Sequence, residues 1–232
     1  MKKMRQACFL NKLILGTICL FINCLTFATN FHLQKGDLLF QDLNCGSLCN
    51  SIDGVTYGYH NSYVSHVAMV IGNESQALVI EAISQGVTIT PLAQFLARSI
   101  DQNGHPRVMV GRLKPQYMYL IPMAIARAKA QLGKPYNKTF VPGAGHSYYC
   151  SELIDTAFQS SNQQNSFFHH YPMNFTDPRT KKILPSWQSY FAKLHAKIPQ
   201  GMFGTNPGQM SRESSLNIIY FYGQLRIHQK SF

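Results

Sequence analysis

Residues 145–158 read GHSYYCSELIDTAF, and this segment places a cysteine at the start of a predicted helix. The apolar residues that follow the cysteine recur at helical spacing, so one face of the helix is expected to pack on a core. The positive end of a helix dipole favours the thiolate form of a cysteine, and the thiolate is the nucleophilic form. Cys150 is therefore the candidate nucleophile of this chain.

Short strands joined by turn signals precede this helix, and one further strand follows it. The predicted strands cover residues 36–40, 64–71, 77–83, 86–89, 107–113 and 216–225. Further helices are predicted over residues 91–98 and 118–132, and residues 44–59 are predicted to form a loop with one helical turn. Consecutive strands with a few helices predict an α+β fold with an antiparallel sheet.

Two ionisable residues, His66 and Glu81, lie on neighbouring strands that are otherwise apolar. If the turn between these strands centres on residues 73–74, directly opposed residues have index numbers that sum to 147. Glu81 then lies opposite His66, on the same face of the sheet. Such a pair is costly to bury unless its members bind each other or serve a function. A slip of one residue would place them on opposite faces, so the hypothesis depends on the register.

These three side chains suit nucleophilic catalysis. Cys150 supplies the thiolate, His66 takes or shares its proton, and Glu81 orients the imidazole and stabilises the imidazolium. The alternative for His66 is an ordinary structural role, since a histidine on a buried strand is often only hydrogen-bonded.

Residues next to Cys150 are candidates for the surroundings of the substrate. The backbone N–H groups of Cys150 and Ser151, near the helix start, form a candidate oxyanion hole. Tyr148 and Tyr149 are candidate pocket or hydrogen-bonding residues. Simple packing of the two tyrosines is the alternative.

Six segments spread along the chain resemble a known family, the circularly permuted papain-like hydrolases of the bacterial NlpC superfamily, in particular the YiiX-like branch. The segments are GDLLFQDLNCGSLC (36–49), SHVAMVIG (65–72), VIEA with the following GVTITPL (79–92), LGKPYN (132–137), YYCSEL (148–153) and IPQGMFGTNPG (198–208). Together they span nearly all of residues 29–232, and the combination is more specific than any single segment.

The resemblance implies that Cys150 is the nucleophile, that His66 is the base and that the polar third residue on the next strand is Glu81. It also implies an antiparallel sheet or partial barrel packed on the nucleophile helix, and hydrolysis or transfer at amide, peptide or acyl groups. The permuted order accounts for a histidine that precedes the cysteine. Asn137 departs from the family pattern, because a carboxylate is expected there more often.

The first 28 residues have the features of a signal peptide. Lys2, Lys3, Arg5 and Lys12 precede an apolar run over residues 13–27, and Ala28 ends an acceptable cleavage site. The run is short for a transmembrane helix, although an uncleaved anchor is the alternative. Cleavage predicts an exported, periplasmic or secreted protein with a single domain over residues 29–232.

The charge and motifs of the mature chain limit the kinds of partner that it is expected to have. Loss of the four basic residues of the leader reduces the net charge from +11 to +7. This surplus is compatible with contact to anionic envelope polymers or lipids. No motif predicts nucleic-acid binding, a cofactor or a metal site. His169 and His170 are adjacent, but an isolated histidine pair is usually a surface feature. The expected substrate is a small peptide, amide or acyl lipid.

The mature chain retains three cysteines. Cys45 and Cys49 are within bridging reach if their segment forms a helical turn, which leaves Cys150 as the free thiol. Three buried thiols are the alternative, and a zinc pair at residues 45 and 49 is disfavoured because no matching ligand pair follows.

Two alternatives to this hypothesis remain, one with a different nucleophile and one without catalysis. CGSLC (45–49) is superficially similar to the CGSC around the papain nucleophile, with His169 or His195 and Asn206 far downstream, but Leu48 breaks the match. A non-catalytic domain that binds an envelope peptide or lipid in the same cleft is the other alternative. The favoured hypothesis is an exported cysteine amidase, peptidase or acyl hydrolase that works through a thioester.

Overall fold

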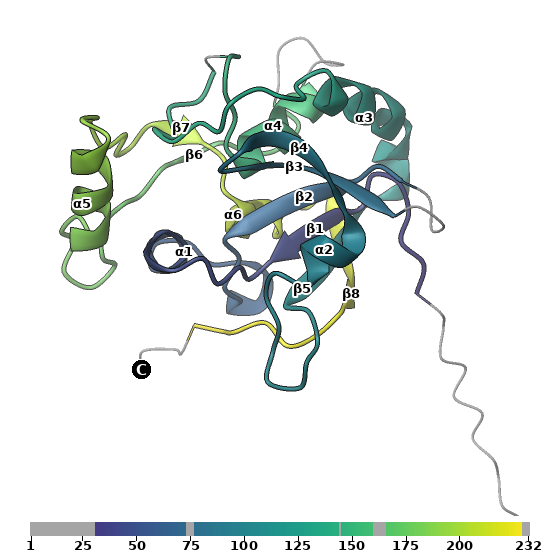
Figure 1. Cartoon of the computed structure of the whole chain (residues 1–232), viewed down its shortest axis with the longest axis horizontal. Helices are drawn as coiled ribbons and strands as arrows, with labels where there is room; N and C mark the ends of the chain where they lie inside the picture. The colour runs from purple at the N-terminus through teal and green to yellow at the C-terminus, as the bar shows by residue number, and fades with distance from the viewer. Residues whose placement is uncertain (1–30, 73–76, 144, 160–165, 229–232) are drawn as a thin grey trace, which may run out of the picture. The chain divides into compact units, whose positions relative to one another are not determined.

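Six antiparallel strands form the central sheet of the protein (Figure 1). The computed structural model describes residues 31–72, 77–143, 145–159 and 166–228. The order across the sheet is β4-β3-β2-β1-β5-β8. The strands are β1 (Leu38–Gln41), β2 (His66–Val70), β3 (Leu78–Ile83), β4 (Gly86–Pro91), β5 (Val108–Leu113) and β8 (Leu216–Phe221). The sheet ends at β4 and β8 and does not close into a barrel. The α+β class with an antiparallel sheet is thereby confirmed.

Helices and short elements complete the fold. The helices are α1 (Ser47–Asp53), α2 (Leu92–Leu96), α3 (Ile121–Lys129), α4 (Cys150–Gln159), α5 (Pro185–Lys193) and α6 (Pro207–Met210). Among the described residues, Tyr59–Asn61 and Pro115–Leu120 form 3₁₀ helices, and β6 (Tyr171–Pro172) pairs with β7 (Phe203–Gly204). The predicted signal peptide lies outside the described residues. None of the helices in the described part of the chain has the length and apolar character needed to cross a bilayer.

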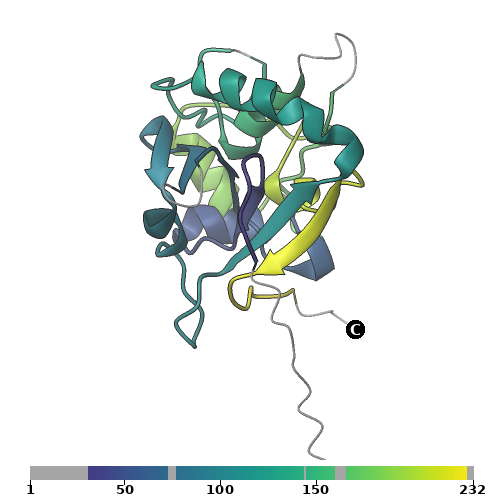
Figure 2. The same cartoon turned by 90° about the vertical axis from the view of Figure 1, so that its right-hand side faces the viewer.

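The sheet is buried on both faces. One face packs against α3 and α4, through residues that include Val67, Met69 and Ile80. The opposite face carries Ala68 and Val70 and packs against Phe95 of α2. Figure 1 shows α3 and α4 on one side of the strands and α2 on the other, and Figure 2 shows the same arrangement from a perpendicular direction. Burial on both faces explains why β2 is apolar without alternation.

The register between β2 and β3 differs from the predicted one. Met69 pairs with Ile80 and Val70 with Val79, so the index numbers sum to 149 and not to 147. Continuing this register places Glu81 opposite Ala68. His66 and Glu81 are therefore diagonal neighbours and not directly opposed residues. Because the error is two residues, both side chains still lie on the same face.

Two helices differ from what the sequence patterns indicate. Residues 47–53 form two turns of helix where a loop with one turn is predicted. Residues 185–193 form α5, which is absent from the prediction. Pro185 occupies its first turn, and Trp187 and Phe191 are buried at i, i+4 spacing, so this segment carries helix signals that the surrounding prolines obscure.

The predicted helix over residues 118–132 is shorter in the structure. Its first part is 3₁₀ helix, and the α-helix begins at Ile121 and ends at Lys129. Pro122 occupies the first turn of α3, where the missing N–H is tolerated.

Candidate active site

Cys150 is the first residue of α4 and the unpaired cysteine among the described residues. The helix starts here because the carboxylate of Glu152 accepts the backbone N–H of Tyr149 at 3.2 Å, as in a capping box. The side chain of Cys150 is buried. The thiol therefore lies at the positive end of a helix whose start is fixed by a local hydrogen bond.

Glu152 also holds the loop that precedes the helix. It accepts the N–H of Gly143 at 3.0 Å and the side-chain amide of Asn137 at 3.1 Å. Burial raises the pKa of the Glu152 carboxyl group, against the effect of these donors. An aspartate in place of Asn137 would oppose Glu152 with a like charge. The partner of Asn137 thus gives a physical reason for its departure from the pattern of the resemblance.

His66 connects the thiol to a carboxylate. It is the first residue of β2, and its Nε2 lies 2.7 Å from Oε2 of Glu81 on β3. The imidazole also hydrogen-bonds the side chain of Cys150. The structure thus brings together the three residues that the sequence patterns select.

The contacts of His66 favour its charged form. Burial by itself lowers the pKa of His66, but hydrogen bonds to Cys150 and Glu81 outweigh burial and raise the pKa to about 9. Burial likewise opposes ionisation of Glu81, yet hydrogen bonds from His66 and Arg98 lower its pKa to about 2. A His66 imidazolium paired with an ionised Glu81 carboxylate is the state that these contacts stabilise.

Sequence reasoning missed two partners of Glu81. Thr90 on β4 donates to Oε1 at 2.5 Å, and the guanidinium of Arg98 donates to both oxygens at 2.7 Å. A usable signal existed, because Arg98 is the sole Lys or Arg between Lys35 and Arg107. A buried carboxylate in that stretch requires a cation nearby.

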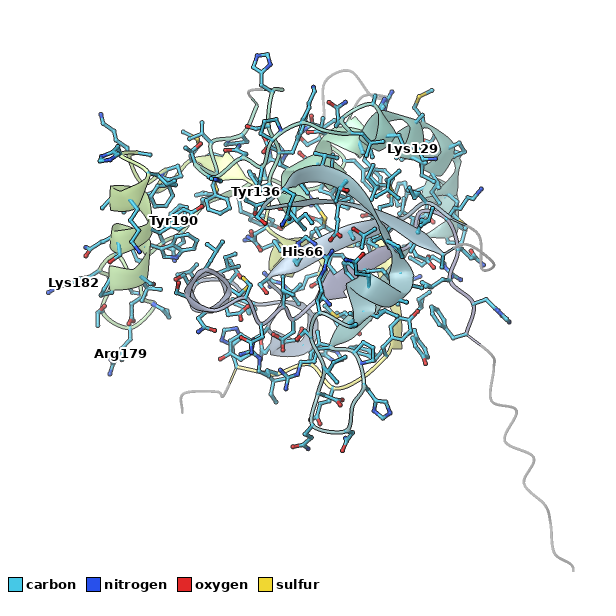
Figure 3. The ribbon with its side chains drawn as sticks, in the orientation of Figure 1. His66, Lys129, Tyr136, Arg179, Lys182 and Tyr190 are labelled. Atoms are coloured by element: carbon cyan, nitrogen blue, oxygen red, sulfur yellow. A yellow bond between two sulfur atoms is a disulfide. The ribbon has the colours of Figure 1, made fainter. Side chains whose placement is uncertain are left out.

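Cys150 and His66 lie in a cleft that has two different halves. One half is an apolar pocket beside Cys150, lined mainly by Phe140, Tyr149, Met173, Phe175 and Trp187. The other half is a wider, more polar groove that reaches His66 and includes Ser84, Gln85, Thr88, Gln94, Lys138 and Tyr190. Tyr136 lines both halves. Figure 3 shows Tyr136 close to His66, with Tyr190 reaching toward them from α5.

The residues predicted to surround the substrate separate into two groups. Ser151 and Tyr149 line the apolar pocket, where Thr205 donates from its hydroxyl to Ser151 at 3.1 Å and from its backbone N–H to Tyr149 at 3.4 Å. Tyr148 instead packs in the main core, and its hydroxyl donates to Gln131 at 3.0 Å. Tyr148 lines neither half of the cleft, so its predicted role beside the substrate is not supported.

The other two cysteines of the described chain are joined by a disulfide bond. Cys45 and Cys49 are bridged at the start of α1, with their Cα atoms 5.3 Å apart. Both line the polar groove. A bridged cysteine cannot act as a nucleophile. The alternative in which residues 45–49 contain the nucleophile, as in the CGSC motif of papain, is therefore wrong for this structure.

The adjacent histidines do not converge on one point. His169 binds Glu213 through Nδ1 at 2.7 Å, whereas His170 binds Asp155 through Nε2 at 2.8 Å. In the described ranges, no group of three or more His, Cys, Asp or Glu side chains is placed to hold a metal ion.

Comparisons with known proteins identify the family. The family model for permuted papain-like amidase enzymes of the YaeF/YiiX type, family C92, matches residues 32–220. A crystal structure described as metalloprotein YiiX from Escherichia coli O157:H7 superposes with a TM-score of 0.64 and 24% sequence identity. The match covers 82% of this chain and 98% of that one, and at this identity it shows a shared fold. No curated protein matches the chain significantly. The chain belongs to the permuted papain-like amidases, a family of cysteine hydrolases.

Proposed function

We propose that the protein is an exported amidase in which Cys150, His66 and Glu81 form the catalytic triad and cleave an amide through a thioester. The observation that supports this assignment is the unbroken series of contacts from Cys150 to His66 to Glu81, at the junction of the pocket and the groove. Family membership supports amide hydrolysis in general, and the site geometry supports the particular residues.

In the first half-reaction, the Cys150 thiolate attacks the carbonyl carbon of the amide, and a C–S bond forms. His66 has taken the thiol proton and is an imidazolium. The tetrahedral intermediate collapses as the C–N bond breaks, and His66 donates its proton to the leaving amine. The acyl group is then held on Cys150 as a thioester.

In the second half-reaction, water enters from the polar groove. His66, now neutral, removes a proton from water as the oxygen attacks the thioester carbon. The C–S bond breaks, the carboxylic acid is released, and the proton on His66 again forms the pair with the thiolate. Glu81 keeps the imidazole oriented throughout and stabilises its charged form.

The start of α4 provides for the charge that develops on the carbonyl oxygen. The backbone N–H groups of Cys150 and Ser151 make no hydrogen bond to another residue in the described part of the chain. They lie in the first turn of the helix, where N–H groups have no partner within the helix. We assign them to the oxyanion hole.

The two halves of the cleft indicate how the substrate lies. The aromatic pocket borders Cys150, so the acyl part of the substrate is expected to be apolar. The polar groove borders His66, which protonates the leaving group, so the amine part is expected to lie there. An amide that joins an apolar acyl group to a polar amine, such as an acylated amino acid or peptide of the envelope, fits both halves.

Mass spectrometry after incubation with candidate substrates tests this function. The wild type, Cys150→Ala and a Cys45→Ala/Cys49→Ala control would be incubated with muropeptides and with N-octanoyl and N-acetyl forms of the same amino acids. We expect cleavage by the wild type and the control only, with at least about 10-fold preference for octanoyl, since each buried CH₂ contributes roughly 0.8 kcal/mol. Products that also form with Cys150→Ala would overturn the proposal.

Two further readings sharpen this experiment. Rapid acid quenching should reveal the acyl mass on the peptide that contains Cys150, because the thioester is an obligate intermediate. The intact mass of protein recovered from expressing cells tests export, since cleavage after Ala28 leaves Thr29 as the first residue. Uncleaved protein confined to the cytoplasm would contradict the export part of the proposal, whereas an uncleaved N-terminus in envelope fractions would contradict only the cleavage; both leave the chemistry unaffected.

A further inference from the structure

Arg98 lies directly behind the carboxylate of the triad. Its Nη1 donates to Oε2 of Glu81 and its Nη2 to Oε1, both at 2.7 Å. Thr90 adds a second donor to Oε1, and His66 is the second partner of Oε2. Each carboxylate oxygen therefore has two partners, and side chains from three directions fix the plane of the carboxylate.

The position of Arg98 is itself fixed by a buried support. Phe95 of α2 is fully buried, and its carbonyl oxygen accepts the side-chain amide of Gln41 at 3.0 Å and the N–H of Arg98 at 3.3 Å. The Phe95 ring lies 5.7 Å from the Arg98 guanidinium carbon and 6.0 Å from the His66 ring. One aromatic side chain thus packs against both cations that share Glu81.

Resting on the triad mechanism above, we propose that Arg98 is a positioning residue that orients Glu81 toward His66 and limits how tightly the carboxylate holds the imidazolium. Two cations share one carboxylate, so their mutual repulsion offsets part of the attraction that Glu81 exerts on each of them. This balance matters because His66 must release its proton to the leaving amine in each turnover. A carboxylate without Arg98 would hold that proton more firmly and would be free to rotate.

The groups that set the titration of the imidazole are few. Cys150 and Glu81 face His66, while Arg98 and Thr90 face Glu81 from the other side. Among these, Arg98 is the permanently charged group, because a guanidinium does not deprotonate in proteins. Its replacement therefore changes the charge around His66 while Cys150 and Glu81, the direct partners of His66, remain chemically the same.

Two variants separate charge from geometry. Arg98→Met removes the charge, so we expect the pH at which His66 loses its proton to rise by roughly one unit. Arg98→Lys keeps the charge but loses the planar fork, so we expect that pH to stay near the wild-type value while turnover falls about 3- to 10-fold. Arg112→Met is the matched control, since Arg112 forms a similar fork on Asp37 with similar exposure.

Nitrogen-15 NMR of the His66 ring across pH 5–11 on the full protein measures the effect, with His66→Gln to assign the signal. A higher deprotonation pH in Arg98→Met, with no change in Arg98→Lys or Arg112→Met, supports the inference. An unchanged deprotonation pH in folded Arg98→Met overturns it and leaves Arg98 a purely structural role. If Arg98→Met does not fold, Arg98→Lys decides, because unchanged turnover in that variant also overturns the inference.

The test is separable from that of the proposed function. If Cys150→Ala abolishes amide cleavage and the NMR titration of Arg98→Met is unchanged, only the role of Arg98 is wrong. If Cys150→Ala retains the cleavage, the triad mechanism fails whatever the titration shows.

Discussion

Replacing Glu81 with glutamine is the most direct test of the charge relationships at this site. The change keeps the size of the side chain and removes its negative charge. Oε2 of Glu81 lies 2.7 Å from His66 Nε2, and both side chains are buried, so the imidazolium loses the carboxylate that it binds directly. We expect Glu81→Gln to disfavour the thiolate–imidazolium pair.

The size of the effect follows from the type of contact. A hydrogen bond to a charged group contributes about 1.5–3 kcal/mol, and about 1.4 kcal/mol corresponds to a factor of ten. We therefore expect the population of the ion pair near neutral pH to fall roughly 10- to 100-fold. The pKa of His66, which is about 9 in the wild type, should fall in the same variant, because the carboxylate is one of the groups that raise it.

Alkylation of Cys150 by iodoacetamide provides an assay that needs no substrate. The rate of modification of the peptide containing Cys150 would be followed by mass spectrometry between pH 5.5 and 10. Since the thiolate is the reactive form, we expect the rate at pH 6.5 to fall roughly 10- to 100-fold in Glu81→Gln. At high pH the two proteins should converge, because the thiolate then forms without the help of the imidazolium.

A matched control excludes a general effect of removing a buried carboxylate. Glu213 binds His169 at 2.7 Å, the same distance as in the triad, and neither residue contacts Cys150. Glu213→Gln should therefore leave the alkylation profile of Cys150 unchanged. A wild-type profile in folded Glu81→Gln would refute the reasoning, since it would show that the carboxylate does not sustain the ion pair.

The remaining predictions concern stability. Asn137→Asp places a like charge about 3.1 Å from Glu152, so the melting temperature at pH 8 should fall by several degrees. The fall should be smaller near pH 4, and equal losses at both pH values would contradict this cause. The pKa of buried Asp53 is raised from 3.8 to about 7, mainly by burial, so stability is lost as pH rises from about 3.8 to about 7. Asp53→Asn should therefore raise the melting temperature at pH 8 but not near pH 4. Removing the disulfide with Cys45→Ala/Cys49→Ala should cost about 2 kcal/mol in the free energy of unfolding, measured in urea, while alkylation of Cys150 continues. Loss of that alkylation would show that the bridge shapes the cleft.

Local chemistry made the three central side chains predictable. Cys150 is marked by its helix start, and His66 and Glu81 are marked because ionisable groups are rare in apolar strands. The face they share was also predictable, since it depends only on whether the register is odd or even. The register itself was not, because the number of residues in a turn is a weak signal in a stretch rich in polar residues.

The partners of the triad were harder to predict because they come from other elements. Arg98 follows α2 and Thr90 lies on β4, so their approach to Glu81 depends on how the helix packs across the sheet. Trp187 and Phe191 of α5 meet Phe140 through long-range aromatic packing. Sequence patterns predict which residues are buried, but they do not show which distant residues will cover them.

The saturated environment of Glu81 explains how this site is compatible with a stable sheet. A fully buried carboxylate is strongly unfavourable unless its oxygens are hydrogen-bonded and its charge is balanced. His66, Arg98 and Thr90 supply four hydrogen bonds, two to each oxygen. Removing any one donor leaves a buried acceptor short of a partner, so under the proposed mechanism stability and catalysis are coupled at this position. Substitutions around Glu81 must therefore be judged by the titration of His66 as well as by activity, because activity alone does not distinguish a misoriented triad from a weakened fold.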